Sequence, residues 1–281
     1  MLLTANDIFN KWWPRLQPLY DKGEAQRLVK WLLEDYYHIS TTDLILGKTI
    51  EITTTDPLER AIQRLNTGEP IQHILGYAWF QELKFKVNRE VLVPRQETEE
   101  LVVLIIREHR GFVGKILDIG TGSGIIPICL KKAFTASKVY GLDVSPSALA
   151  VAKENARIHQ TEIDWLELDI LSYSPDQKFD IIVSNPPYVL ASDKREMHPN
   201  VLNHDPGLAL FVPDENPLLF YNRICHLSEQ LLNLNGTLYF EIHEKFGEEV
   251  KELMQKSGLE NVRIHSDLNG KDRIVCGIKK G

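Results

Sequence analysis

Strand-like and helix-like segments alternate through the second half of the chain, and this alternation limits the possible folds more than any other feature. Buried strands are predicted at 115–119, 138–143, 163–168 and 179–184, with helices from about 125 and at 146–159. Helices of this length between strands imply a parallel sheet that is covered on both faces. The sequence therefore predicts a doubly wound, Rossmann-like α/β domain.

A different pattern precedes this domain. Between Ala5 and Leu75 apolar residues recur at spacings of three and four, for example at Ala25, Val29 and Leu32, which predicts amphipathic helices. Asp56 is placed to cap a helix that begins at Pro57. We therefore expect a small helical domain over residues 1–75.

Residues 76–93 are predicted to form a β-hairpin that links the two domains. Apolar and polar residues alternate there, except across Gln81 and Glu82, where the phase slips as it does at a turn. The catalytic domain would then span 94–281, with further helices near 216–232 and 246–256 and a strand at 237–242. Two last strands, at 262–265 and 273–278, are expected to form an antiparallel edge hairpin.

Composition excludes several classes of protein. The formal net charge is −7, which disfavours broad attraction to nucleic-acid phosphates. The longest aliphatic run, 101–106, is too short to cross a bilayer, and the N-terminus lacks the features of a secretory signal, so we expect a cytoplasmic protein. Cys129, Cys225 and Cys276 show no paired spacing and are expected to be buried thiols. His198 and His204 lack the companions that a metal site needs, so we expect no metal.

A glycine-rich turn follows the first predicted strand of the α/β domain. Strand 115–119 runs into Gly120-Thr121-Gly122-Ser123-Gly124 and then into an apolar helix. Glycines permit positive φ and a close approach of a ligand to the backbone, so this segment predicts a nucleotide-cofactor loop, although a purely structural turn is the alternative. Ile125 stands where a dinucleotide-binding fingerprint needs glycine, which argues against a nicotinamide or flavin cofactor.

Acidic residues end the next two strands at the same edge of the sheet. Asp143 is expected to accept hydrogen bonds from ribose hydroxyls, while Ser145 is the better candidate to cap the following helix. Asp169 could accept from an adenine amino group and Ile170 could pack on the ring, with an ordinary turn as the alternative for Asp169.

The strand 179–184 ends in Asn185-Pro186-Pro187-Tyr188. The prolines stiffen the turn and remove two backbone donors, which leaves carbonyl oxygens and the Asn185 side chain as an acceptor-rich wall. A planar NH2 group offers two donors, and such a wall accepts both. The segment therefore predicts a site for a planar amino or amide nitrogen, against the alternative of a rigid surface turn.

The order of glycine loop, acidic ribose ligand and Asn-Pro-Pro-Tyr resembles that of class I methyltransferases that act on nitrogen. More specifically, the chain resembles the release-factor glutamine methyltransferases, the PrmC or HemK family, along nearly its whole length. The matching stretches are 72–76, Val93-Pro94-Arg95-Gln96-Glu97-Thr98-Glu99, 116–124, 143–155, 184–189 and Asp267-Leu268-Asn269-Gly270-Lys271-Asp272-Arg273. The chain departs from the family at His73 and Ile170, where aromatic residues are usual. It also departs at Ile242-His243, where in the family a glycine often follows the Glu241-Ile pair.

This resemblance implies a seven-stranded class I methyltransferase domain with an antiparallel last strand, S-adenosylmethionine as cofactor and S-adenosylhomocysteine as product. The substrate it implies is the Gly-Gly-Gln glutamine of class 1 peptide chain release factors, methylated at the side-chain amide nitrogen. In this reading Asn185 and the Pro186 carbonyl accept the two amide N–H groups, Pro187 stiffens the wall, and Tyr188 stacks on the amide. The N-terminal domain would embrace the release factor, and we expect a monomer.

Two rival functions remain open from the sequence. A DNA or RNA adenine methyltransferase would use the same acceptor wall, but it would need aromatic platforms and a basic segment to capture an unstacked base, and Arg223, Arg263 and Arg273 are scattered. A non-catalytic interaction module built on the helical domain is the second rival. An intact Asn185-to-Tyr188 segment disfavours it.

Overall fold

The structure, a computed structural model, describes residues 2–17, 19–51, 57–172, 176–195 and 206–280. Asp56, His198 and His204, considered above as a helix cap and as metal ligands, lie outside these ranges. The contacts divide the chain into a first compact unit, Met1–Gly76, and a second that begins at Tyr77. Each unit is described by itself.

The first unit is helical, and its elements are β1 (Leu2–Thr4), α1 (Ala5–Trp12), α2 (Lys22–Tyr37), α3 (Thr41–Ile45), β2 (Thr49–Glu51), α4 (Pro57–Leu65) and α5 (Ile71–Leu75). Reciprocal side-chain and backbone hydrogen bonds between Thr4 and Asp7 fix the start of α1, and the same arrangement between Ser40 and Asp43 fixes α3. The apolar stripe of α2, with Ala25, Val29, Leu32 and Leu33, is buried in one core shared by these helices.

A hairpin opens the second unit. Its strands are β3 (Tyr77–Phe80) and β4 (Leu83–Lys86), and Gln81 and Glu82 between them both have positive φ, at 47° and 61°. A two-residue turn of this kind matches the twist of the flanking strands. The predicted phase slip at these two residues is therefore a turn.

The second unit is built on a seven-stranded sheet with the order β12-β13-β11-β8-β5-β6-β7. The strands are β5 (Lys115–Ile119), β6 (Lys138–Asp143), β7 (Asp164–Glu167), β8 (Phe179–Ser184), β11 (Leu232–Glu241), β12 (Leu259–Ser266) and β13 (Asp272–Lys279). Strands β11, β8, β5, β6 and β7 pair in parallel, whereas β13 is antiparallel to both of its neighbours, β11 and the edge strand β12. The predicted fold class, including the antiparallel last strand, is confirmed.

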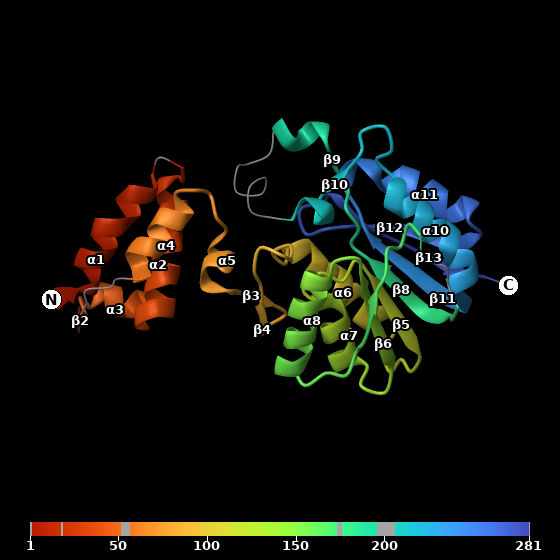
Figure 1. Cartoon of the computed structure of the whole chain (residues 1–281), viewed down its shortest axis with the longest axis horizontal. Coiled ribbons are helices and arrows are strands. Elements are labelled where there is room, and N and C mark those ends of the chain that lie inside the picture. Colours follow the sequence, from red (N-terminus) through yellow and green to blue (C-terminus); the bar gives the residue numbers. More distant parts are fainter. Residues whose placement is uncertain (1, 18, 52–56, 173–175, 196–205, 281) are drawn as a thin grey trace. The chain divides into compact units, whose positions relative to one another are not determined.

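Helices cover both faces of the sheet (Figure 1), and they are α6 (Gln96–Glu108), α7 (Ile125–Ala133), α8 (Pro146–Ile158), α10 (Leu219–Leu231) and α11 (Gly247–Lys256). Alternate residues of a strand enter different cores: Ile181 and Val183 pack in the core that holds α6 and α7, whereas Ile182 packs in the core that holds α10 and α11. Both faces are therefore buried, which explains the nearly continuous apolar strands.

Some boundaries differ from the sequence predictions. Helix α10 begins at Leu219 rather than near residue 216. Strand β11 begins at Leu232 rather than Thr237, and its pairing with β8 shifts register between these residues, where Asn235 has a φ of 63°. That irregular segment is polar and carries a glycine, so its periodicity did not indicate a strand. A short parallel pair, β9 (Val189–Leu190) with β10 (Phe211–Val212), follows the Asn-Pro-Pro-Tyr segment.

Candidate active site

The site lies where the strand order reverses, between β5 and β8. After β5 the chain adds β6 and β7 on one side, and β8 then returns to pair with the other side of β5. The carboxyl ends of strands at such a reversal form a crevice that commonly binds ligands. The glycine loop follows β5 and Asn185 follows β8, so both candidate motifs meet at this point.

Backbone geometry brings these two motifs together. Gly120, Gly122 and Gly124 have φ values of 77°, 52° and 79°, which side chains rarely tolerate. A side chain on Gly120 would begin 3.9 Å from the Asn185 carbonyl oxygen. The Ser184 hydroxyl donates to the Ile119 carbonyl oxygen at 2.8 Å and ties the two strand ends together.

Asp143 lies at the end of β6 and is linked to the glycine loop. Its Oδ2 accepts from the Gly122 N–H at 2.8 Å, and its Oδ1 accepts from the Ser145 N–H at 2.9 Å. Ser145 caps α8 by accepting from the Ala148 N–H, as the sequence predicted. The half-buried Asp143 carboxylate is thus held at the loop by backbone donors rather than used as a helix cap.

Asp118, inside β5, is a site residue that the sequence predictions missed. Its side chain is fully buried, and within the described part of the chain neither its carboxylate oxygens nor the Thr121 hydroxyl has a hydrogen-bond partner. The pKa of Asp118 is raised to about 7, mainly by burial and to a smaller extent by the neighbouring Asp143, while the nearby Thr121 hydroxyl offsets part of the rise without forming a well-aligned bond. A carboxylate within an otherwise apolar strand, one residue before the strand ends, was the available signal.

The region after β7 holds the two residues predicted to contact an adenine ring. Asp169 is exposed and accepts from the Leu171 N–H at 2.9 Å, as in a turn, and Ile170 is buried in the core. Leu168 and Val144 leave apolar surface exposed near the same edge, where the Leu168 N–H donates to the Asp143 carbonyl oxygen. The contacts of Asp169 and Ile170 with an adenine ring remain predictions.

The Asn-Pro-Pro-Tyr segment is anchored by side chains from other elements. The Asn185 Nδ2 donates to the Thr98 hydroxyl at 3.2 Å, and that hydroxyl donates to Glu241 Oε2 at 2.7 Å. The Tyr188 hydroxyl donates to Glu241 Oε1 at 3.5 Å. Thr98 lies in the first turn of α6 and Glu241 ends β11, so the turn after β8 is connected to two further elements.

Glu241 is the second buried carboxylate at this edge. Burial raises its pKa to about 7, and the Thr98 hydroxyl and the Arg273 guanidinium oppose that rise. Burial also raises the pKa of the Tyr188 hydroxyl, so this group stays protonated and remains a donor. Thr98 entered the sequence analysis only within a stretch that resembled a family, and Glu241 only within the predicted strand 237–242, because periodicity gives no sign that two residues so far apart meet.

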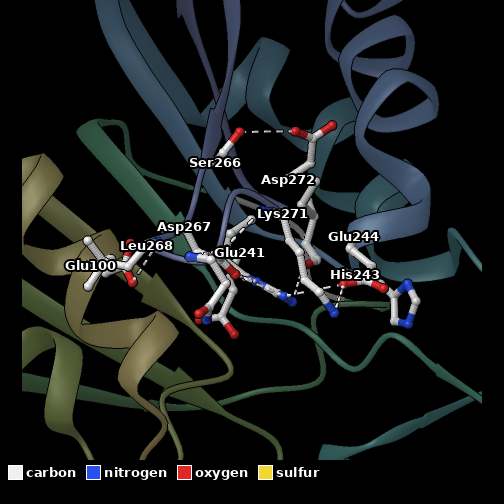
Figure 2. Close-up of polar contacts among 12 residues, drawn as sticks. Glu100, Glu241, His243, Glu244, Ser266, Asp267, Leu268, Lys271 and Asp272 are labelled. Atoms are coloured by element: carbon white, nitrogen blue, oxygen red, sulfur yellow. Dashed lines mark hydrogen bonds and ion pairs between the residues drawn. The ribbon is translucent and has the colours of Figure 1, made fainter.

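The loop between β12 and β13 closes the same edge of the sheet (Figure 2). The Asp267 carboxylate accepts from the Asn269 and Lys271 N–H groups at 2.9 and 3.0 Å and from the Arg273 guanidinium at 3.2 Å. Arg273 also donates to the Ile242 carbonyl oxygen at 3.3 Å. The Asp-Leu-Asn-Gly-Lys-Asp-Arg stretch therefore fixes the backbone directly after Glu241.

Comparison with known proteins identifies the family. The family model described as methyltransferase small domain matches residues 98–204, and the one described as PrmC N-terminal domain matches residues 14–76. A release factor glutamine methyltransferase from Flavobacterium psychrophilum is 42% identical to this chain over 267 residues, which cover 92% of this chain and 94% of that protein. A release factor glutamine methyltransferase from Bacteroides thetaiotaomicron is 42% identical over 264 residues, which cover 92% and 95%.

The chain belongs to the release factor glutamine methyltransferase family. The match extends beyond the seven-stranded sheet to the first compact unit. The family model for the PrmC N-terminal domain ends at residue 76, where that unit also ends. A solved methyltransferase from Pyrococcus furiosus shares the fold, with a TM-score of 0.53, 17% identity and coverage of 72% of this chain and 91% of that one. Within the described ranges, no helix combines the length and apolar character needed to span a membrane.

Proposed function

We propose that this chain transfers the methyl group of S-adenosylmethionine to the side-chain amide nitrogen of the glutamine in the Gly-Gly-Gln segment of class 1 release factors. The products are N5-methylglutamine and S-adenosylhomocysteine. The arrangement of Asn185 carries the proposal, because its Nδ2 is used by Thr98 and its Oδ1 is left to accept from a substrate NH2 group. The family membership selects an amide of a release factor among the planar nitrogens that such a wall fits.

The residues around the glycine loop fit the proposed cofactor. Asp118 and Thr121 are buried polar side chains without hydrogen-bond partners in the described chain, and a bound group with donors would satisfy them. The methionine part of the cofactor carries an ammonium group, which offers both donors and positive charge. Asp143 would hold the ribose and the loop from Gly120 to Gly124 would lie against the cofactor, while Asp169 and Ile170 would face the adenine.

S-Adenosylmethionine, when bound, supplies a methyl group on a positively charged sulfur. An amide nitrogen is a poor nucleophile because its lone pair is delocalised into the carbonyl, so the site must contribute placement more than a base. The Asn185 Oδ1 and the Pro186 carbonyl would accept the two amide N–H groups and aim the nitrogen, and Tyr188 would pack on the amide plane. Such orientation supplies a large part of a barrier reduction.

Proton removal needs no dedicated base in this mechanism. After methyl transfer the nitrogen is strongly acidic, and its proton passes readily to water or to an acceptor of the wall. Asn185 and Pro187 contribute no titratable group, and Tyr188 is kept protonated by burial. The chemistry of these side chains is therefore binding, orientation and exclusion of water.

The first unit would recognise the body of the release factor. Its aromatic residues are mainly structural, since Trp12 is buried and Trp13, Trp31, Tyr36 and Tyr37 pack against the core. Recognition would use the polar face of the helices, and we propose that the enzyme acts as a cytoplasmic monomer.

One experiment separates the glutamine activity from the nucleic-acid alternative. Purified release factors, unmodified DNA and unmodified rRNA are each incubated with the enzyme and methyl-labelled S-adenosylmethionine. We expect label only in the release factors and only on the Gly-Gly-Gln glutamine, located by mass spectrometry, with a release factor carrying Gln→Ala there as the matched control. Label in DNA or rRNA, or in the control, would contradict the proposal.

A further inference from the structure

A polar side-chain network runs from the Asn-Pro-Pro-Tyr segment into the protein. It links Asn185, Thr98, Glu241 and Tyr188 through hydrogen bonds of 3.2, 2.7 and 3.5 Å. Glu241 has no exposed surface and Thr98 is 2% exposed, so water does not compete for these contacts. Hydrogen bonds are stronger in the low dielectric of a protein interior, so a fully bonded network of this kind fixes which groups donate and which accept.

The direction of each hydrogen bond follows from the number of protons that each side chain can donate and from the atoms that can only accept. An ionised carboxylate only accepts, so both the Thr98 and the Tyr188 hydroxyls must donate to Glu241. The Thr98 hydroxyl has one proton, and with that proton committed to Glu241 its oxygen can only accept from Asn185. The Asn185 amide must then turn its NH2 group toward Thr98 and its oxygen away from it.

The orientation of this amide decides whether the site can work. With its oxygen presented, Asn185 accepts an N–H of the substrate amide. With the amide reversed, its NH2 group would face the substrate NH2 group, and two donors would oppose each other. Asparagine alone has no strong preference between these two orientations, because its oxygen and nitrogen are nearly equal in size.

We propose that Thr98 and Glu241 are positioning residues that set the orientation of the Asn185 amide and thereby make it an acceptor for the substrate nitrogen. This inference rests on the function proposed above. Neither residue touches the substrate in this scheme. They act through the Thr98 hydroxyl. Because this hydroxyl donates its proton to the ionised Glu241 carboxylate, its oxygen can only accept from Asn185.

The charge of Glu241 is controlled by groups from every element around it. Arg95, Glu97 and Thr98 face it from the start of α6, Arg273 from β13, and Tyr188 from the turn after β8. The Tyr221 hydroxyl of α10 donates to its backbone oxygen at 3.1 Å. Burial raises the pKa of Glu241 to about 7, which the Thr98 hydroxyl and the two arginines oppose and Glu97 reinforces.

Protonation of Glu241 should therefore disable the network. A protonated carboxyl can donate to Thr98, which frees the Thr98 proton to donate to the Asn185 oxygen and permits the reversed amide. Because the pKa is raised, the carboxylate form is present above about pH 7 and is lost as the pH falls through it. The rate of methyl transfer at saturating cofactor should therefore fall as the pH is lowered, with its midpoint at the pKa of Glu241.

The chain offers a matched control two residues earlier on the same strand. Tyr239 is also fully buried and points to the same face of β11, and its hydroxyl donates to Glu108 at the other end of α6 at 2.7 Å. Tyr239→Phe removes this partly buried hydrogen bond between the same two elements, together with the 2.8 Å contact of its hydroxyl with His109 Nε2, without touching Asn185. It therefore measures how much of any defect is merely structural.

The experiment compares Thr98→Val, Thr98→Ser, Glu241→Gln and Tyr239→Phe with the wild-type enzyme. Single-turnover methylation of a release factor is followed from pH 5.5 to 9 at saturating cofactor, cofactor affinity is measured by calorimetry, and folding is checked by thermal unfolding. We expect Thr98→Val and Glu241→Gln to lower the transfer rate by ~10- to 100-fold, as small misplacements do, with cofactor affinity changed less than ~3-fold. Thr98→Ser, which keeps the hydroxyl, and Tyr239→Phe should stay within ~3-fold of the wild type.

Further outcomes decide the proposal. Glu241→Gln should remove the acid limb of the pH profile, and the Thr98→Val, Glu241→Gln double variant should be no slower than the worse single variant, since both act on one orientation. Thr98→Val as fast as Tyr239→Phe, or a Glu241→Gln enzyme that keeps the acid limb, would overturn the inference. If Glu241→Gln fails to fold, the Thr98→Val and Thr98→Ser pair decides it. A wild-type enzyme that leaves the release factor unlabelled would instead refute the proposed function.

Discussion

Replacing Asp118 with asparagine should make the cofactor-free enzyme more stable and bind its cofactor less tightly. The wild-type carboxylate is fully buried and has no hydrogen-bond partner in the described chain, so its charge opposes folding until a cation arrives. Burial moves its pKa from the ordinary 3.8 to about 7. A rise of that size costs on the order of 4 kcal/mol at alkaline pH.

The sign of the pH dependence follows from this raised pKa. The folded protein holds the Asp118 proton more tightly than the unfolded chain, so its contribution to stability is complete at low pH and is lost as the pH rises through about 7. Asparagine has no proton to lose. Because its buried amide still lacks partners, which costs ~1 to 3 kcal/mol, the net gain at pH 8.5 should be ~1 to 3 kcal/mol, or several degrees in Tm. At pH 5.5 the two proteins should melt together.

Cofactor binding should respond in the opposite direction. A hydrogen bond to a charged group contributes ~1.5 to 3 kcal/mol, so losing the carboxylate that we propose faces the cofactor's ammonium group should weaken affinity by ~10- to 100-fold. Thermal unfolding at both pH values, with and without S-adenosylmethionine, and calorimetry provide the measurements. An Asp118→Asn enzyme that melts no higher at pH 8.5 and binds the cofactor normally would refute the reasoning.

Asp143→Asn is the matched control, because Asp143 lies on the neighbouring strand and accepts from two backbone N–H groups. An asparagine amide can accept only one of those bonds in the same geometry. This variant should lose both stability and cofactor affinity. The two aspartates should therefore affect stability in opposite directions while they affect binding in the same direction.

Four further predictions concern the nitrogen wall, the proposed ribose ligand and the first unit. Asn185→Ala should fold and keep cofactor affinity within a small factor but transfer the methyl group ~100-fold or more slowly, and single-turnover kinetics at a near-normal rate would exclude the clamp. Asn185→Asp should bind the cationic cofactor more tightly yet transfer more slowly, which calorimetry and single turnover test together. Asp143→Ala should weaken cofactor binding by ~1 to 3 kcal/mol, and unchanged calorimetric affinity would remove the ribose assignment. Deleting residues 1–75 should spare cofactor binding and depress methylation of a whole release factor far more than of a Gly-Gly-Gln peptide. Equal losses on both substrates would remove the recognition role.

Local sequence determined the fold and the glycine loop. Apolar runs bounded by turn residues, spaced by helical segments, defined the strands from Lys115 to Ser184 and their parallel order, since both faces of such a sheet must be buried. The positive φ values of Gly120, Gly122 and Gly124 were likewise implied by residue type. These features depend on neighbours in the chain, so periodicity and local chemistry reveal them.

The sequence alone also selected Asn185 and Asp143, because each follows a predicted strand at the carboxyl edge of a parallel sheet. Their hydrogen-bond partners were decided by tertiary structure. Thr98 and Glu241 stand 143 positions apart in the chain. They meet only because α6 packs against β11, the strand that lies beside β8 in the sheet. Asp118 was hidden for a related reason, since a carboxylate in an apolar strand gives no sign of whether folding will provide a partner. Local pattern determines which segments form elements, whereas the pairing of side chains across the sheet depends on how those elements pack, and that packing places the proposed acceptor of the substrate amide.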